Sequence, residues 1–226
     1  MIKLFTDEGW PNFSEDDGIL STGAPIIFIW GGRGTGKTYG ALKHVHQTEE
    51  EFLYLRRTPQ QAELICSSPL MWPWSPLNND LNTHYAPFKM SQIAGMYEVG
   101  NAGAYTDTGV PIRPAQMSGV LGNVVTMART RGFSSPNTSI IILDEYQKEE
   151  SDYYRRGEGV GLANIYETVN RNRELQGQKP ITLLCMSNAV GMANPYYMQW
   201  DITDTVERMI GKKERVKLLK DKGAFC

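Results

Sequence analysis

One segment, Gly31–Thr38, has the residue types and spacing of a phosphate-binding loop. Its sequence GGRGTGKT matches the pattern G-x-x-x-x-G-K-[ST], known as Walker A. Glycines let the backbone wrap closely around phosphates because they adopt positive φ at little cost, and the N–H groups of such a loop attract anions. In this pattern Lys37 reaches the β- and γ-phosphates and the Thr38 hydroxyl coordinates Mg²⁺. We therefore predict a nucleoside triphosphate site; the alternative is a glycine-rich turn before an ordinary helix.

A second candidate is the acidic pair Asp144-Glu145, which directly follows the apolar run Ile140–Leu143. An acid at the end of such a strand is typical of Walker B, in which Asp144 would hold Mg²⁺ directly or through water. Glu145 would orient and deprotonate the attacking water. The alternative is an acidic pair that caps the next turn. The chain has no NKxD motif of the kind GTPase switches use, and small-molecule kinases generally lack this paired acid, so we expect ATP hydrolysis.

A weaker candidate is the polar pair Ser187-Asn188 at the end of the apolar segment Ile181–Met186. A polar side chain in this position could hydrogen-bond the γ-phosphate or the lytic water, as a sensor does. Polar residues also end many ordinary strands, so both interpretations stay open.

Arg171 is a candidate for a role in a neighbouring subunit. On a helical wheel it lies about 180° from Leu162 and from the apolar stripe that Leu162 begins. It could project outward into a neighbour's ATP site as an arginine finger. Alternatively it is a solvated arginine that pairs with Glu167 one turn earlier. Arg173 lies only about 20° from Leu162, on the packed side or beyond the helix end.

Four apolar segments predict the strands that position these residues: Ile26–Trp30, Glu51–Leu55, Ser139–Leu143 and Ile181–Met186. Apolar residues at successive positions suit strands that are covered on both faces. Helices are predicted at Lys37–Gln47, from Thr58-Pro59 onward and at Val160–Leu175. Strands that alternate with helices predict an α/β fold, with a central, mainly parallel sheet flanked by helices.

The remaining segments differ in composition. Residues 1–24 are broken by Gly and Pro, and with five acids and one lysine in residues 1–17 they predict an acidic lead-in with little regular structure. Residues 68–136 are rich in Pro, Gly, Asn and Met, which predicts a small, irregular, β-rich insertion with strand pairs around Gly95–Met127. Residues 207–222 hold seven bases and three acids. This basic tail could meet DNA phosphates or form an ordinary solvated helix.

Length and composition favour one globular domain. The chain has 226 residues, 41% of them hydrophobic and 21% charged, which is typical of folded proteins. No apolar run approaches the roughly 18 residues of a membrane helix, and the N-terminus turns acidic too early for a signal peptide. We therefore expect an intracellular protein without membrane contact. The net charge of −2 argues mildly against a dedicated DNA-binding protein.

Taken in order, the motifs resemble those of the DNA-encapsidation ATPases of φ29-like short-tailed phages. The matching segments lie within about residues 25–200: Gly31–Thr38, Tyr54-Leu55-Arg56-Arg57, Asp144-Glu145, Arg171-Asn172-Arg173-Glu174, Ser187-Asn188-Ala189-Val190 and Asn194-Pro195-Tyr196. The resemblance implies a P-loop NTPase of the ASCE division, with a catalytic glutamate and an additional strand between the Walker A and Walker B strands. It also implies a homo-oligomeric ring of five subunits at the portal of an empty phage head (the prohead), where it drives double-stranded DNA inward.

Together with the motifs, the resemblance assigns roles to individual residues. The catalytic set is Lys37, Glu145, Arg171 and Arg131, the last of which, with Arg129 nearby, occupies a region where the family has a basic residue suspected of acting in trans. The nucleotide-binding set is Gly31, Gly32, Arg33, Gly34, Thr35, Gly36, Lys37, Thr38, Tyr39, Arg56 and Arg57. Within it, Arg33 resembles the Walker A arginine, and Arg56 and Arg57 flank the adenine side. Ser187 and Asn188 form the sensor, and Thr38 and Asp144 bind Mg²⁺.

The resemblance ends near the C-terminus. Such proteins usually continue into a second domain that resembles a degenerate RNase H-like nuclease, whereas this sequence supplies 25 residues after Asp201. We therefore expect an ATPase domain at residues 25–205, followed by residues 206–226 as a tail or as a linker towards a missing domain. The expected location is the host-cell cytoplasm and, transiently, the portal vertex, with a packaging RNA left open as a further partner. The alternative functions are a helicase or replication loader, and a slow nucleotide-gated binding protein.

Overall fold

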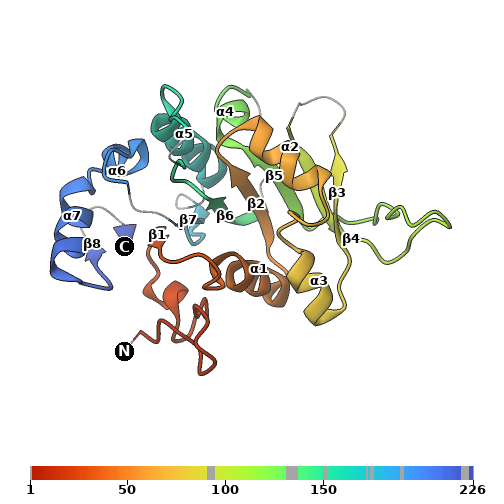
Figure 1. Ribbon diagram of the computed structural model, residues 1–226, viewed down its shortest axis with the longest axis horizontal. Helices are drawn as coiled ribbons and strands as arrows, with labels where there is room; N and C mark the ends of the chain where they lie inside the picture. Colours follow the sequence, from red (N-terminus) through yellow and green to blue (C-terminus); the bar gives the residue numbers. More distant parts are fainter. Residues whose placement is uncertain are drawn as a thin grey trace.

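Strands and helices alternate along most of the chain (Figure 1). The computed structural model describes residues 2–90, 95–130, 137–149, 152–171, 173, 176–188, 191–219 and 224–225. The strands are β1 (Ile26–Trp30), β2 (Glu51–Arg56), β3 (Tyr85–Lys89), β4 (Tyr97–Asn101), β5 (Gly119–Asn123), β6 (Thr138–Asp144), β7 (Thr182–Ser187), β8 (Leu218–Leu219) and β9 (Ala224–Phe225). The helices are the 3-10 helix η1 (Ile19–Thr22), α1 (Lys37–Thr48), α2 (Pro59–Ser67), α3 (Ser75–Leu81), α4 (Val124–Met127), α5 (Glu158–Asn170), α6 (Pro195–Gln199) and α7 (Thr203–Lys212). No helix among the described residues combines the length and apolar character needed to cross a bilayer.

The described strands form a nine-stranded sheet in the order β3-β4-β5-β2-β6-β7-β1-β9-β8. Pairs between β5 and β9 are parallel, whereas β3, β4 and β8 pair antiparallel. The predicted α/β fold with a mainly parallel sheet is confirmed, and each of the four predicted strands agrees within one residue at either end. β7 lies between β1 and β6. One further strand therefore separates the strand before the glycine-rich loop from the strand that ends in Asp144.

Part of the segment 68–136, for which we predict a small, irregular, β-rich insertion, belongs to this sheet. Strand β5 pairs in parallel with β2, β4 pairs with β5, and β3 pairs with β4 as the outermost strand on that side of the sheet. A Cβ on Gly119 would lie 2.4 Å from the carbonyl oxygen of Phe52, so the close pairing of β5 with β2 requires glycine there. Because glycine usually indicates a turn or weakens a strand, the composition of the segment concealed this strand. The prediction of short strands around Gly95–Met127 is confirmed by β4 and β5.

Helices cover both faces of the sheet, with α1 and α3 on one side and α5 and α6 on the other (Figure 1). Side chains alternate between the two faces along a strand. In β6, Ile140 and Ile142 face the core formed with α1, α2 and α3, whereas Ile141 and Leu143 face the core formed with α4 to α7. A strand covered on both sides therefore needs the unbroken apolar run from which it was predicted.

The two terminal segments of the described chain pack on the part of the sheet that carries β1. In the lead-in, Phe13 is buried, and a Cβ on Gly36 would lie 2.5 Å from the Trp10 ring. The expected boundary at residue 206 falls inside α7, whose Val206 and Met209 are buried. Strand β9 pairs in parallel with β1. Both segments therefore contribute to the fold around the Walker A segment.

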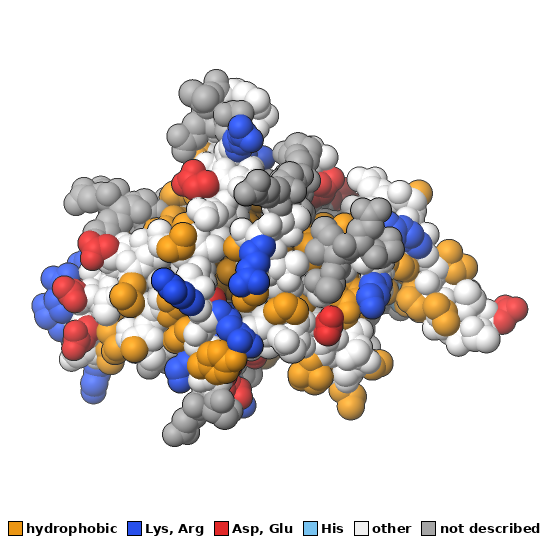
Figure 2. Space-filling model, turned by 90° about the horizontal axis from the view of Figure 1, so that it is seen from above, with side chains coloured by type: hydrophobic (Ala, Val, Ile, Leu, Met, Phe, Trp, Pro, Cys, Tyr) orange, Lys and Arg blue, Asp and Glu red, His pale blue; other side chains and the backbone are white. Residues whose placement is uncertain are grey.

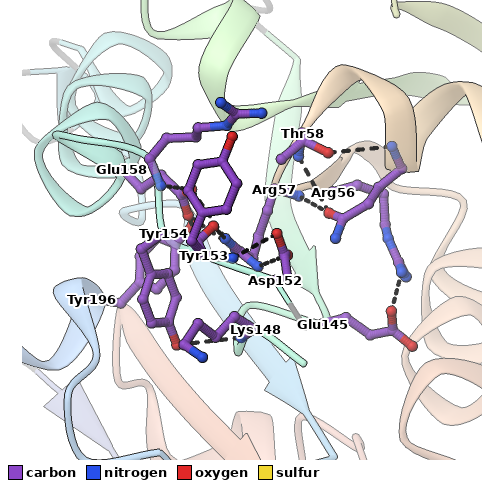
Figure 3. Close-up of polar contacts among 12 residues, drawn as sticks. Arg56, Arg57, Thr58, Glu145, Lys148, Asp152, Tyr153, Tyr154, Glu158 and Tyr196 are labelled. Atoms are coloured by element: carbon purple, nitrogen blue, oxygen red, sulfur yellow. Dashed lines mark hydrogen bonds and ion pairs between the residues drawn. The ribbon is translucent and has the colours of Figure 1, made fainter. Parts of the chain in front are cut away.

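An ion-pair cluster around Arg57 fastens β2 to α5 (Figure 3). The Arg57 side chain is fully buried, and its Nε and Nη2 donate to the two carboxylate oxygens of Glu158 at 3.0 and 3.1 Å. Nη1 donates to Asp152 at 2.7 Å, and the guanidinium lies 4.7 Å from the centre of the Tyr154 ring. The Tyr196 hydroxyl donates to Glu158 at 2.8 Å. The buried charges of Arg57 and Glu158 are thus paired with each other and hydrogen-bonded to further groups. Burial of a charge is costly without such partners.

Neutralising Glu158 tests whether this cluster holds the fold together. We expect Glu158→Gln to lower the free energy of unfolding by about 3 kcal/mol, because it leaves the Arg57 guanidinium buried with too little opposite charge. Urea unfolding monitored by circular dichroism measures the change. The matched control is Glu98→Gln, which breaks the more exposed Arg113–Glu98 pair and should cost less than about 1 kcal/mol. Equal effects of the two substitutions would contradict the assignment.

Candidate nucleotide site

The segment between β1 and α1 has the backbone conformation of a loop that can surround an anion. Gly34 and Gly36 have φ of +72° and +77°, a region that side chains other than glycine rarely adopt. Helix α1 begins at Lys37 immediately after this loop. The N-terminus of a 12-residue helix therefore faces the same space as the loop.

Lys37 folds back over the loop that precedes it. Its Nζ donates to the carbonyl oxygen of Gly32 at 2.8 Å, to that of Gly31 at 3.3 Å and to the Thr35 hydroxyl at 3.2 Å. Burial lowers the pKa of the Lys37 ammonium from its ordinary value, and the nearby charge of Asp144 partly opposes this effect. A partly desolvated cation held against this loop at the start of a helix is suited to bind phosphate oxygens.

The carboxylate of Asp144 is the meeting point of three elements. Its Oδ2 accepts from the Tyr54 hydroxyl at 2.6 Å, from the Thr38 hydroxyl at 3.1 Å and from Arg56 Nη1 at 3.4 Å. Burial, followed by the charge of Asp144, raises the pKa of Tyr54 well above its ordinary value, so this phenol stays a hydrogen-bond donor. Strand β6 supplies Asp144, β2 supplies Tyr54 and Arg56, and α1 supplies Thr38. The Walker A candidate Thr38 and the Walker B candidate Asp144 are therefore in direct contact.

Glu145 lies beside this cluster in an unusual backbone conformation. Its φ is +55°, which costs about 1 kcal/mol or more for a residue other than glycine. Its N–H donates to Asp144 Oδ1 at 3.1 Å, and its carboxylate pairs with Arg56 Nη2 (Figure 3). Burial acts to lower the pKa of Arg56, but Tyr54 and the two acids raise it above its ordinary value. Arg56 thus bridges both acids as a permanent cation.

The two adjacent arginines point to different sites (Figure 3). The resemblance implies that Arg56 and Arg57 both flank the adenine. In the structure Arg56 contacts Asp144 and Glu145, whereas Arg57 contacts Asp152 and Glu158 in the buried cluster. Successive strand residues face opposite sides of a sheet. That alternation is the sequence signal that separates the two arginines, and it also places Tyr54 and Arg56 on one side.

The sensor candidates lie at the end of the strand between β1 and β6. Ser187 is buried, and its carbonyl oxygen accepts from the N–H of Gly31 at 3.2 Å. Asn188 follows it and is half-buried. The pair is therefore joined to the first residue of the Walker A segment through the backbone.

Arg171 does not lie on a helix, because α5 ends at Asn170, earlier than the predicted Leu175. The Asn170 side chain accepts from the N–H of Ile181 at 3.0 Å, which ties the helix end to the next strand segment. Arg171 is exposed at the cap position, so the helical-wheel argument does not place it. Arg173 lies beyond the helix end and donates to the carbonyl oxygen of Thr138 at 3.3 Å. Because β6 begins at Thr138, this region lies at the edge of the sheet opposite the phosphate loop.

The other candidates are more peripheral. Arg33 is exposed and pairs with the exposed Glu149 at 2.6 Å. Tyr39 is half-buried on α1, and the Lys43 ammonium lies 5.9 Å from the centre of its ring. Arg131 lies outside the described residues.

Two hollows lie along the same edge of the sheet. One, of about 470 Å³, borders the phosphate loop and is lined by the lead-in and the end of α7. The other, of about 310 Å³, lies between α4 and the start of α5 and is rimmed by Arg129, Arg155 and Arg156. The first hollow lies beside β1, and the second lies beside α4, which follows β5. Because β5 is four strands from β1 in the sheet, the two strands are about 19 Å apart at the usual strand spacing. The two hollows are therefore separate. On the face seen from above, basic side chains gather near the middle, with acidic ones mostly nearer the margins (Figure 2).

The residues at this edge fit a magnesium nucleotide. Mg²⁺ prefers oxygen ligands, keeps several waters and shares substrate phosphates, so one hydroxyl and one carboxylate are a sufficient protein contribution. Thr38 and Asp144 supply these oxygens 3.1 Å apart. No group of three or more His, Cys, Asp or Glu side chains suited to an all-protein metal site occurs among the described residues. The pairing of one hydroxyl, from Thr38, with one carboxylate, from Asp144, suits a metal that arrives with phosphates.

Part of the chain matches a family model, and most of it is similar to proteins named as phage DNA packaging proteins. Residues 120–219 match the family model of the podovirus DNA encapsidation protein (Gp16). The chain is 24% identical over 196 residues to the DNA packaging protein of Bacillus phage phi29, covering 84% of this chain and 50% of the relative. It is 25% identical over 195 residues to that of Bacillus phage B103, covering 84% and 52%. The chain thus spans about half the length of the curated relatives it matches.

Solved structures show the same fold. The N-terminal domain of the DNA packaging ATPase from bacteriophage phi29 superposes with a TM-score of 0.61 at 22% identity, covering 94% of this chain and 93% of that one. A chain of the bacteriophage phi29 genome packaging motor assembly gives 0.62 at 20% identity, covering 99% and 56%. The chain therefore has the fold of a phage packaging ATPase N-terminal domain, and it is related in sequence to podovirus DNA packaging proteins.

Proposed function

We propose that this chain is the ATP-hydrolysing part of a motor that moves double-stranded viral DNA into a preformed phage head. The observation that carries the proposal is the contact between Thr38 of the phosphate loop and Asp144, with Glu145 next to it, at one edge of the sheet. This arrangement occurs in the fold of a packaging ATPase N-terminal domain. A strand between β1 and β6, together with a glutamate after Asp144, supports assignment to the ASCE division of P-loop NTPases.

Each residue at the edge has a distinct role in the proposed hydrolysis. The loop N–H groups and Lys37 bind the phosphates, and Arg33 adds positive charge as transfer proceeds. Thr38 and Asp144 hold Mg²⁺, which neutralises phosphate charge when bound. Glu145 orients the attacking water and accepts its proton. For that step its carboxylate must leave Arg56, the residue with which it pairs in this structure.

The proposed motor is a homo-oligomeric ring, a pentamer on the phage head, in which Arg171 completes the site of a neighbour. Arg171 is exposed at the edge of the sheet opposite its own phosphate loop. The 13 residues of α5 alone span about 20 Å. This distance supports the proposal that Arg171 acts on a site in another subunit. Arg131 is a second candidate for a trans role.

The proposed partners are double-stranded DNA, the portal of the prohead and, as a further component, a packaging RNA. Arg129, Arg155 and Arg156 are described residues suited to contact DNA phosphates. A second domain resembling a nuclease would follow the ATPase domain in the working motor. The chain would act in the host-cell cytoplasm and at the portal vertex.

The alternative functions predict different effects on duplex DNA and different dependence of ATP turnover on duplex DNA. A helicase or replication loader predicts strand separation, whereas packaging predicts translocation on intact duplex that depends on portal-bearing heads. A nucleotide-gated binding protein predicts slow turnover with or without duplex. Turnover and strand-displacement assays with the same duplex distinguish the three.

Glu145 gives a direct test of the proposed hydrolysis. We expect Glu145→Gln to reduce ATP turnover at least about a hundredfold, because the amide cannot accept the proton of the attacking water, while ATP still binds. Phosphate release measures turnover, and calorimetry measures binding. Glu167→Gln, an exposed acid on α5, is the control and should turn over normally. Wild-type turnover by Glu145→Gln in intact rings would refute the assignment.

Mixed rings test the proposed trans role of Arg171. Subunits with Arg171→Ala keep an intact Walker set, and subunits with Glu145→Gln keep an intact arginine, so mixed rings should recover turnover that neither variant shows alone. Mass photometry verifies that the rings are mixed. Arg208→Ala, an exposed arginine on α7, should be active without mixing. Mixed rings without recovered turnover would count against Arg171.

A further inference from the structure

The segment between β4 and β5 forms a hairpin that projects from the sheet (Figure 1). Tyr105 and Pro111 form an antiparallel bridge between its two arms. At the tip, the N–H of Gly109 donates to the carbonyl oxygen of Thr106 at 2.9 Å, and Gly109 has a φ of +77°. A short turn that ends in a left-handed glycine is a common hairpin connection. The projecting hairpin is therefore closed by its own backbone hydrogen bonds.

The base of the hairpin is fixed to strand β4. A Cβ on Gly100 would lie 2.6 Å from the Pro114 ring and 2.8 Å from the sulfur of Met117, so the returning arm packs closely on this strand. The Arg113 guanidinium pairs with Glu98, also on β4. The hairpin therefore has a defined direction relative to the sheet.

The projecting part of the hairpin exposes apolar side chains. Tyr105, Val110 and Ile112 are 46%, 55% and 47% exposed. Val110 and Ile112 lie two residues apart on one arm, so their side chains face the same way. Figure 2 shows apolar side chains gathered on the lobe that projects at the right. Exposed apolar side chains that cluster in this way indicate a contact surface for another protein.

The charges of the hairpin argue against DNA as its partner. Between residues 102 and 117 the sequence has one acid, Asp107, and one base, Arg113. Arg113 is already paired with Glu98, which leaves the acid at the tip as the remaining charge. DNA phosphates are bound mainly by Lys and Arg, and an acidic tip would repel them.

The opposite end of the molecule has complementary features. Helix α7 and β8, the last strand in the order of the sheet, lie at the other end of the longest axis from the hairpin (Figure 1). Ile210 on α7 and Leu218 on β8 are 45% and 43% exposed. Residues 208–217 hold five bases and one acid. This end therefore offers apolar side chains within a positively charged surface, whereas the hairpin offers apolar side chains with an acidic tip.

We propose that the hairpin binds the end of a second copy of this chain that carries α7 and β8. The inference rests on the proposed function, which requires a ring. A closed ring needs a contact between two different surfaces of each subunit, repeated head to tail. Because β8, β9 and β1 are neighbours in the sheet, the contact brings the hairpin of one subunit to the end of the next that carries the phosphate loop.

The double variant Val110→Ser and Ile112→Ser removes the apolar part of this contact. We expect the concentration needed for half-maximal ring assembly to rise about tenfold or more, because less apolar surface is buried between subunits. Mass photometry of the full chain, alone and on portal-bearing heads, measures assembly. The matched control, Leu64→Ser and Met71→Ser, changes residues that are 50% and 46% exposed on and after α2, and it should assemble like the wild type. Thermal unfolding and calorimetry with MgATP verify that both variants are folded and keep the nucleotide site.

Charge exchange tests which surface the tip meets. Asp107→Lys should weaken assembly, and so should Lys212→Glu combined with Arg215→Glu. The triple variant should assemble better than either, because opposite charges face each other again, and salt should reduce this difference. A triple variant that assembles no better than Asp107→Lys alone would contradict the proposed contact.

A photo-cross-linking amino acid in place of Val110 identifies the partner directly. In a mixture of isotope-labelled and unlabelled chains on portal-bearing heads, we expect cross-links between copies that reach residues 203–219. Cross-links to DNA, to the portal protein or to another part of the second copy overturn the proposal. Normal assembly by the Val110 and Ile112 variant also overturns it, while the proposed ring and ATP hydrolysis stand. If the wild type forms no ring in solution or on heads, the ring of the proposed function fails and the contact with it.

Discussion

The carboxylate of Asp144 is the constraint around which this structure is organised. It lies at the end of a strand buried on both faces, where an unpaired charge would cost several kcal/mol. Tyr54, Thr38 and Arg56 satisfy it from two further elements. These contacts fix the ends of β6, β2 and the start of α1 relative to one another. The site that would hold Mg²⁺ and phosphate is therefore also a structural junction.

Strand β2 connects this junction to the rest of the fold. At its end, Arg56 is held by Asp144 and Glu145, and the next residue, Arg57, is held by Glu158 and Asp152 near the start of α5. Arg56 and Arg57 are adjacent in the chain, so a movement of Arg56 away from Glu145 would displace the backbone of Arg57, whose side chain lies in the buried ion-pair cluster. The backbone of β2 thus offers a short path from the acid proposed to activate water to helix α5, which leads to Arg171.

Much of the fold could be predicted because its signals are local. The apolar run before Asp144 predicts a doubly covered strand, and the glycine pattern before Lys37 predicts the loop and the helix start. Contacts between distant segments could not be predicted in this way. Gly119 looks like a turn residue but permits the close pairing of β5 with β2. The end of α5 at Asn170 depends on a side-chain hydrogen bond to Ile181, eleven residues later, which no periodicity reveals.

We propose above all that Thr38 and Asp144 hold Mg²⁺ together with the phosphates of ATP. Pulsed electron paramagnetic resonance with Mn²⁺ in place of Mg²⁺ tests it directly, because coupling to phosphorus appears only when the metal contacts the bound phosphates. We predict that the wild type with ATP shows this coupling and that Asp144→Asn and Thr38→Val weaken Mn²⁺ binding. The matched control Asp204→Asn, which changes an exposed acid on α7, should leave Mn²⁺ binding unchanged. Coupling that is absent in the wild type, or that is unaffected by both substitutions, would contradict the account.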